Sequence, residues 1–134
     1  MTVSLSTVHI LVDDPDAALG FYRDALGLTV SKEVANGAFK WITLVADTQP
    51  EIGIVLSQPH AGRSQEEGDA LAAMLAKGEM YPVHFRTDDL DATFDKIATA
   101  PGVEVLQEPV SQPWGVRDAA VRDPAGNRLR IEQG

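Results

Sequence analysis

Hydrophobic and polar positions change their spacing along the first part of the chain. Apolar residues alternate with polar ones or run together over residues 7–13, TVHILVD, which predicts a strand. From Ala18 to Leu26 the apolar residues recur at helical spacing. Asp14 followed by Pro15 is a favourable helix start, because the carboxylate caps free N–H groups and proline needs no N–H in the first turn. The pattern predicts a strand followed by a helix.

The same pattern occurs a second time, 75 residues further on. VHILVDDPDAALGFY, residues 8–22, aligns without a gap with VHFRTDDLDATFDKI, residues 83–97, and six of the fifteen positions are identical. His9 matches His84, and Asp89 takes the capping place of Asp14. These matches indicate an internal duplication.

Three strand-like runs follow each copy, separated by turn signals such as Asn36-Gly37 and DPAGN from Asp123. The chain therefore predicts two βαβββ modules within a single domain over residues 1–134, of the α+β class. The runs are residues 28–34, 39–47 and 51–58 in the first module and 103–110, 115–123 and 127–133 in the second. Module one covers about 5–59, a connecting segment with a short helix near 66–76 covers about 60–81, and module two covers about 82–134.

Composition narrows the classes of function. The net charge of −9 and the lack of a Lys/Arg cluster argue against nucleic acid as a partner. No apolar run reaches the roughly 20 residues of a membrane span, and the N-terminus does not resemble a signal peptide, so we expect no membrane contact and a cytoplasmic location. The absence of cysteine excludes disulfides and thiolate chemistry.

Two motifs carry a resemblance to a known family. VDDPDAALGFYRDALGL, residues 12–28, and PWGVRDAAVRDPAGNRLRIEQ, residues 113–133, resemble the vicinal oxygen chelate superfamily of glyoxalase I, extradiol dioxygenases and bleomycin resistance proteins. The resemblance implies that the two modules form a half-open mixed β-barrel with a concave ligand cavity. It also implies a homodimer. The fold alone does not name the function, because it serves lyases, isomerases, oxygenases and drug-binding proteins.

The family's metal-binding positions do not hold metal-binding residues here. Counted from the two helices, from the QP pair after the fourth strand and from the DPAGN turn, these positions fall at Thr7, Pro82, Val55 and Arg130. None of these side chains is a good ligand, and one is a cation. We therefore expect the usual metal to be absent and no cofactor to be bound.

An alternative metal site lies two residues away. His9, His84 and Glu132 are each displaced by two positions in the same direction, and a shift of two in a strand keeps a side chain on the same face. Two imidazoles and one carboxylate match the triad of non-haem iron sites. A divalent metal at this displaced site is the alternative hypothesis.

Strand alternation then predicts the residues that line the cavity. Arginine holds carboxylates and phosphates in two-point contacts, which favours an acid-bearing ligand, although Arg86 and Arg130 could equally pair with Glu132 or nearby aspartates. The aromatic rings of Trp41 and Trp114 could form walls that contact a flat ligand, or they could be ordinary residues of the hydrophobic core. Either histidine could act alone as a general base. The predicted cavity residues are Thr7, His9, Trp41, Val55, His84, Arg86, Trp114, Arg130 and Glu132.

Two functions follow from this reading. The first is a small-molecule-binding protein of the bleomycin-resistance type, which holds a polar or acid-bearing ligand without the usual metal. The alternative is a metal-dependent lyase, isomerase or dioxygenase that acts on vicinal oxygens through His9, His84 and Glu132. No catalytic residue is assigned by the sequence in the first case.

Overall fold

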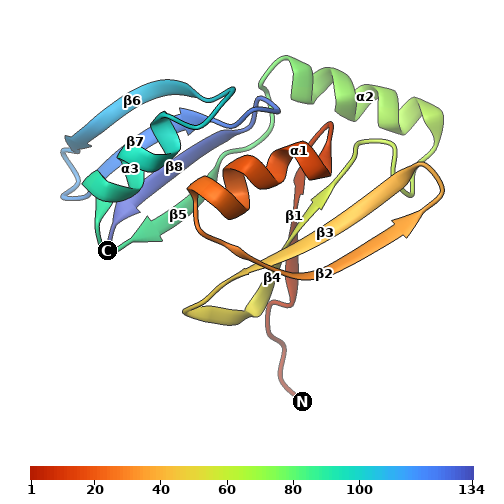
Figure 1. Ribbon diagram of the computed structural model, residues 1–134, viewed down its shortest axis with the longest axis horizontal. Helices are drawn as coiled ribbons and strands as arrows, with labels where there is room; N and C mark the ends of the chain where they lie inside the picture. The colour runs from red at the N-terminus through yellow and green to blue at the C-terminus, as the bar shows by residue number, and fades with distance from the viewer.

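The computed structural model describes residues 1–134 and contains two four-stranded mixed sheets with three α-helices (Figure 1). The first sheet has the order β1-β4-β3-β2, and the second has the order β5-β8-β7-β6. The strands of the first sheet are β1 (Thr7–Leu11), β2 (Thr29–Asn36), β3 (Phe39–Ala46) and β4 (Gln49–Ser57). Those of the second are β5 (Val83–Thr87), β6 (Glu104–Ser111), β7 (Arg117–Arg122) and β8 (Arg128–Gln133).

The two modules repeat one topology. In each, the first strand pairs in parallel with the last, and the other neighbours are antiparallel. The helices are α1 (Pro15–Leu19), α2 (Gln65–Ala76) and α3 (Leu90–Ala98). The predicted tandem βαβββ fold is confirmed, and the sheets are not closed into a full barrel. No helix is long and apolar enough to cross a membrane.

The predicted helix starts are also confirmed. The Asp14 carboxylate accepts hydrogen bonds from the N–H groups of Asp16 and Ala17, and Asp89 accepts one from Ala92. The periodicity did not predict that α1 widens into a π-helical stretch, η1 (Gly20–Ala25). Within η1 the adjacent rings of Phe21 and Tyr22 are both buried and meet edge to face, with centroids 4.9 Å apart.

One apolar core serves both modules. α1 contacts β3 and β4, α3 contacts β7 and β8, and α3 also contacts η1. Ile10 of β1 and Val12 just after it are buried, whereas Val8 on the same face is 37% exposed. The core contains 16 buried residues: Ile10, Val12, Ala18, Leu19, Phe21, Tyr22, Leu28, Ile42, Leu44, Leu56, Leu90, Ile97, Ala119, Val121, Leu129 and Ile131.

Buried hydrogen bonds join the modules at the β7–β8 turn. The Tyr22 hydroxyl donates to Oδ2 of Asp123, and the Asn127 side chain donates to the Leu11 carbonyl at 2.7 Å. Asn127 also donates to Asp123 through its backbone N–H and its side chain, at 2.7 and 3.0 Å. The DPAGN motif therefore fixes the second module against the first helix and the first strand.

The connecting segment carries α2, which starts one residue before the predicted position. The Ser64 hydroxyl caps it by accepting from the Glu67 N–H at 3.2 Å. At the other end the Arg122 guanidinium donates to the carbonyls of Gly78 and Gly126, at 3.3 and 3.1 Å. α2 is thereby tied to the β7–β8 turn of module two (Figure 1).

Candidate functional site

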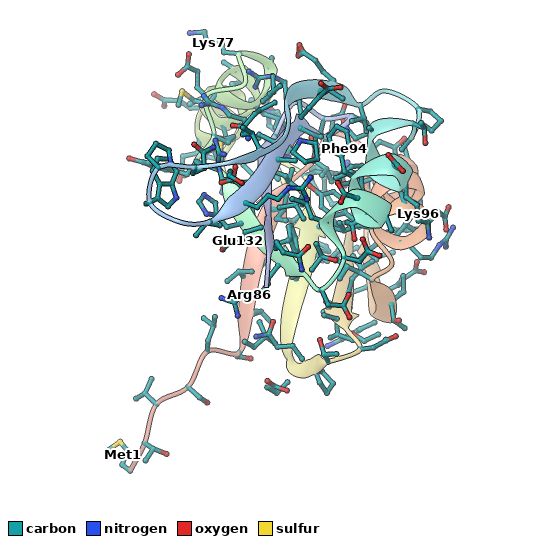
Figure 2. The ribbon with its side chains drawn as sticks, turned by 90° about the vertical axis from the view of Figure 1, so that its left-hand side faces the viewer. Met1, Lys77, Arg86, Phe94, Lys96 and Glu132 are labelled. Atoms are coloured by element: carbon teal, nitrogen blue, oxygen red, sulfur yellow. The ribbon has the colours of Figure 1, made fainter.

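The first candidate is a polar face on the second sheet, which we call the second polar face. Strand register places Arg86, Glu132 and Asp118 in one row across β5, β8 and β7, and His84 and Arg130 in the next row. Figure 2 shows Arg86 and Glu132 on one side of the sheet, with Phe94 of α3 on the other side. The apolar side packs under α3, so the charged side chains are left on the opposite face.

A buried carboxylate organises this face. Asp118 is 2% exposed, and its Oδ2 lies 3.1 Å from Nη1 of Arg130. The side-chain amides of Gln107 and Gln112 donate to its Oδ1 at 3.0 and 2.9 Å. Arg130 also donates to Oε1 of Gln107 at 3.3 Å. The four side chains form one network, and none of their buried polar atoms lacks a partner.

The network stabilises the charged form of Asp118. Burial acts to raise the pKa of this carboxyl group, but hydrogen bonds from Gln112, Gln107 and Arg130, with the charge of Arg130, outweigh burial and lower the pKa. Asp118 is therefore ionised at neutral pH. The carboxylate in turn holds the Arg130 guanidinium in one place.

A second candidate lies on the first sheet, which we call the first polar face. His9 stands beside Val55 in the β1–β4 pairing, and Thr43 of β3 extends the row. Nδ1 of His9 lies 3.1 Å from the hydroxyl of Ser57, which is buried. Ser57 thus holds the imidazole, whose ring is otherwise exposed on the sheet. Trp41 of the same face is partly buried.

The predicted cavity residues are divided between these two faces. Thr7, His9, Trp41 and Val55 belong to the first, and His84, Arg86, Arg130 and Glu132 belong to the second. Trp114 lies on the β6–β7 turn and is 69% exposed, so the alternative of a core tryptophan is wrong for this residue.

A cavity of about 800 Å³ borders the second polar face. His84, Arg86 and Glu132 line it, together with Asp47 of the β3–β4 turn and Asp88 after β5. It has no lining residue from the first polar face. Within one chain, three of the nine predicted residues therefore share this cavity.

Comparison with known proteins decides the family. The model of the Glyoxalase/Bleomycin resistance protein/Dioxygenase superfamily matches residues 4–131. The chain belongs to this superfamily. Among curated relatives, "Putative glyoxylase CFP32" of Mycobacterium tuberculosis is 34% identical over 119 residues, which are 88% of this chain. The match spans only 39% of that relative's length.

Two solved structures share the fold of this chain. UcmS2 superposes with a TM-score of 0.84 at 30% identity, and the match covers all of both chains. TnmS3 of Streptomyces sp. CB03234, described as an antibiotic binding protein, gives a TM-score of 0.74 over 99% of this chain and 98% of its own. Its 23% identity shows the shared fold alone.

The metal used by many superfamily members does not fit the residues of this chain. At the four expected positions, Val55 is a buried aliphatic residue, and Arg130 is a cation paired with Asp118. Thr7 and Pro82 offer no imidazole or carboxylate. The displaced trio is not assembled either, because His9 lies on the first sheet, whereas His84 and Glu132 lie on the second. No three His, Asp or Glu side chains form a group that could hold a metal ion.

Sequence reasoning missed the residues that organise both faces. Asp118, Gln107 and Gln112 lie within or beside β6 and β7, and the sequence did not single them out. For Asp118 the one signal was strand alternation, since it takes the same face as Glu132 and is followed in β7 by three apolar residues. Ser57 carried no signal, because it meets His9 only through the β1–β4 pairing, across 48 residues of sequence.

Proposed function

We propose that the protein binds a small acid-bearing molecule on the second polar face and does so without a metal ion. The observation that supports this function is the ion pair by which Asp118 holds the guanidinium of Arg130, a residue that falls at an expected metal-ligand position when counted from the DPAGN turn. A fixed positive charge on this face can attract the anionic group that a metal would otherwise coordinate.

Arg130 has capacity left for a ligand. Both of its contacts, with Asp118 and with Gln107, involve Nη1. A guanidinium carries five N–H donors, and the Nε and Nη2 groups make no hydrogen bond within the chain. The side chain is 34% exposed. A carboxylate or phosphate oxygen pair matches the fork geometry that remains.

The ligand in this proposal also contacts aromatic and imidazole groups. Trp114 is exposed on the β6–β7 turn, two residues after Gln112, which donates to Asp118. His84 lies beside Arg130 in the β5–β8 pairing. A flat acid would combine a stacking surface with a charged group. The fold is compatible with this role, because TnmS3, described as an antibiotic binding protein, has it.

We further propose that the protein acts as a homodimer in which the two polar faces meet across the subunit contact. Each face is open within one chain, and the apolar side chains of Val34, Val110 and Trp114 are exposed. Residues 1–6 extend away from the body, with Val3 and Leu5 exposed (Figures 1 and 2). Pairing of two chains would cover these groups.

A ligand screen tests the binding function. We expect small aromatic carboxylic acids, but not their amides, to raise the melting temperature of the wild type in proportion to the logarithm of concentration. Arg130→Gln should lose this effect. Arg117→Gln is the matched control, because Arg117 is the neighbour of Asp118 on the opposite face of β7 and pairs with Asp91. An undiminished shift in the Arg130→Gln variant would contradict the proposal.

Metal analysis tests the rival, metal-dependent enzyme. The rival requires His9, His84 and Glu132 to converge from two sheets, which one chain does not achieve. We expect protein purified without chelators or an affinity tag to hold no stoichiometric divalent metal. Stoichiometric metal that is lost in both His9→Ala and His84→Ala would support the rival and a site shared between chains.

A further inference from the structure

A separate cavity of about 260 Å³ lies under helix α2. Its lining residues are Asp13, Phe39, Gln58, Pro59, His60, Ala72, Leu75, Ala76 and Ala125. None of them belongs to either polar face, and the connecting segment supplies much of the wall. The cavity therefore needs an explanation of its own.

The wall is mostly apolar. Phe39 begins β3, Pro59 follows the end of β4, and Ala125 lies in the β7–β8 turn. α2 contributes Ala72 and Ala76. The two alanines are spaced by four and so stand on one side of the helix. Their short side chains leave space that a leucine would fill. A ring or short alkyl group suits such a wall.

Two of the three polar side chains that line the cavity, Asp13 and His60, offer acceptors. The third, Gln58, uses its Oε1 to accept the Lys40 N–H at 3.0 Å, and its Nε2 is the one amide donor. One carboxylate oxygen of Asp13 accepts the Asp14 N–H at 3.0 Å, and the other has no partner. Nε2 of His60 lies 2.8 Å from Oδ1 of Asp69, which places the proton of a neutral ring on Nε2 and leaves Nδ1 as an acceptor. No lysine or arginine lines the cavity.

Close packing fixes the roof of the cavity. Gly68 of α2 lies against His60, where an added Cβ would come within 2.9 Å of the His60 Cα. At the other end of the helix Leu75 is buried, and its carbonyl lies against Gly126 of the β7–β8 turn. The helix is thus held at both ends, and the space beneath it is present before a ligand arrives.

We propose that the cavity under α2 is a second ligand site, which takes a small organic amine with one ring or a short alkyl chain. The size sets the first limit, because about 260 Å³ lies below the range of roughly 300–1,000 Å³ typical of drug-sized ligands. The charge of the lining sets the second limit on the ligand, because Asp13 offers a carboxylate oxygen and no basic side chain of the lining competes for it. The second polar face, which carries arginine, selects the opposite charge.

Benzylamine is a suitable probe, with benzyl alcohol and benzoate as its neutral and anionic counterparts. Binding to the 134-residue chain is followed by chemical-shift changes of the α2 and His60 amides and by isothermal titration calorimetry. We expect saturable binding of benzylamine centred on these residues. Binding of benzyl alcohol should be about two- to fivefold weaker, because the carboxylate of Asp13 is exposed, and benzoate should cause no change there.

Two pairs of variants assign the site. Ala72→Leu should fill the cavity and abolish benzylamine binding, whereas Ala70→Leu, on the exposed side of α2, should leave it unchanged. Asp13→Asn keeps an oxygen for the Asp14 N–H and removes the charge of an exposed carboxylate, so it should weaken benzylamine binding about two- to fivefold. Arg130→Gln should have no effect. The proposal is overturned if benzylamine does not saturate, or if the Ala72→Leu variant, folded by its amide spectrum, still binds it.

Discussion

The Tyr22 hydroxyl donates a 2.5 Å hydrogen bond to Oδ2 of Asp123, and this bond joins the first helix of one module to the last turn of the other. Both side chains are buried. Tyr22→Phe should lower the free energy of unfolding by about 1–3 kcal/mol, because one oxygen of a buried carboxylate loses a donor. Urea denaturation followed by circular dichroism measures this change.

Tyr81→Phe is the control for that substitution. Tyr81 is 93% exposed, so removal of its hydroxyl should change the free energy of unfolding by less than about 0.5 kcal/mol. Equal effects of the two variants would show that the link between the modules contributes nothing to stability.

Alkaline pH should weaken the same link. Burial first, and then the charge and hydrogen bond of Asp123, raise the pKa of Tyr22 well above its usual value of 10.0. Its stabilising contribution is therefore complete below about pH 10, the pKa in the unfolded chain, and is lost as pH rises toward the folded-state pKa. The difference in unfolding free energy between wild type and Tyr22→Phe should shrink by up to about 1.4 kcal/mol per pH unit above pH 10. A difference that is constant between pH 9 and 11.5 would argue against this account.

Acid should act on the second polar face through Asp118. Its pKa is lowered in the folded protein, so its contribution is present above about pH 4, the unfolded value, and is lost as pH falls through the folded-state pKa. At pH 7, Asp118→Asn should cost about 1.5–3 kcal/mol, and this cost should diminish below pH 4. Asp91→Asn, which breaks an exposed ion pair with Arg117, should cost under about 1 kcal/mol.

Two glycines in helices should respond to alanine in opposite directions. Gly20 has helical backbone angles and nothing near its missing Cβ, so Gly20→Ala should stabilise the protein by about 0.5–1 kcal/mol. Gly68→Ala should destabilise it by about 1–3 kcal/mol, because the new methyl group collides with His60. Thermal unfolding of both variants tests the pair. A stabilised Gly68→Ala would show that α2 can move away from His60.

Much of the fold could be predicted from the sequence because its signals are local. Asp14 and Asp89 cap their helices through groups only two or three residues away, and the strand pattern is readable within each segment. The η1 stretch was missed because apolar spacing alone does not distinguish a π-helical turn from an α-helical one; η1 buries both Phe21 and Tyr22.

The candidate site was less predictable because its contacts cross strands. Gln107 pairs with Ala120 and yet donates to Asp118, and β6 carries register irregularities on both sides of that glutamine, which strand alternation does not predict. The sequence identified Arg130 and left open whether it pairs with an acid. The structure resolves that point in favour of an aspartate that alternation alone did not single out. Whether the nine predicted residues contact a ligand stays a prediction.

The core drawn from both modules has a consequence for how the chain tolerates cleavage. Its 16 residues include ten from module one and six from module two, so neither half can bury its own helix without the other. A protease cut in an exposed part of the connecting segment, between Gly62 and Glu67, should leave two complementary fragments that stay associated. When the fragments are separated, the first would expose Phe21 and Tyr22 to water, and the second would expose Leu90 and Ile97. Because burying these side chains again is favourable, the two fragments should recombine when they are mixed.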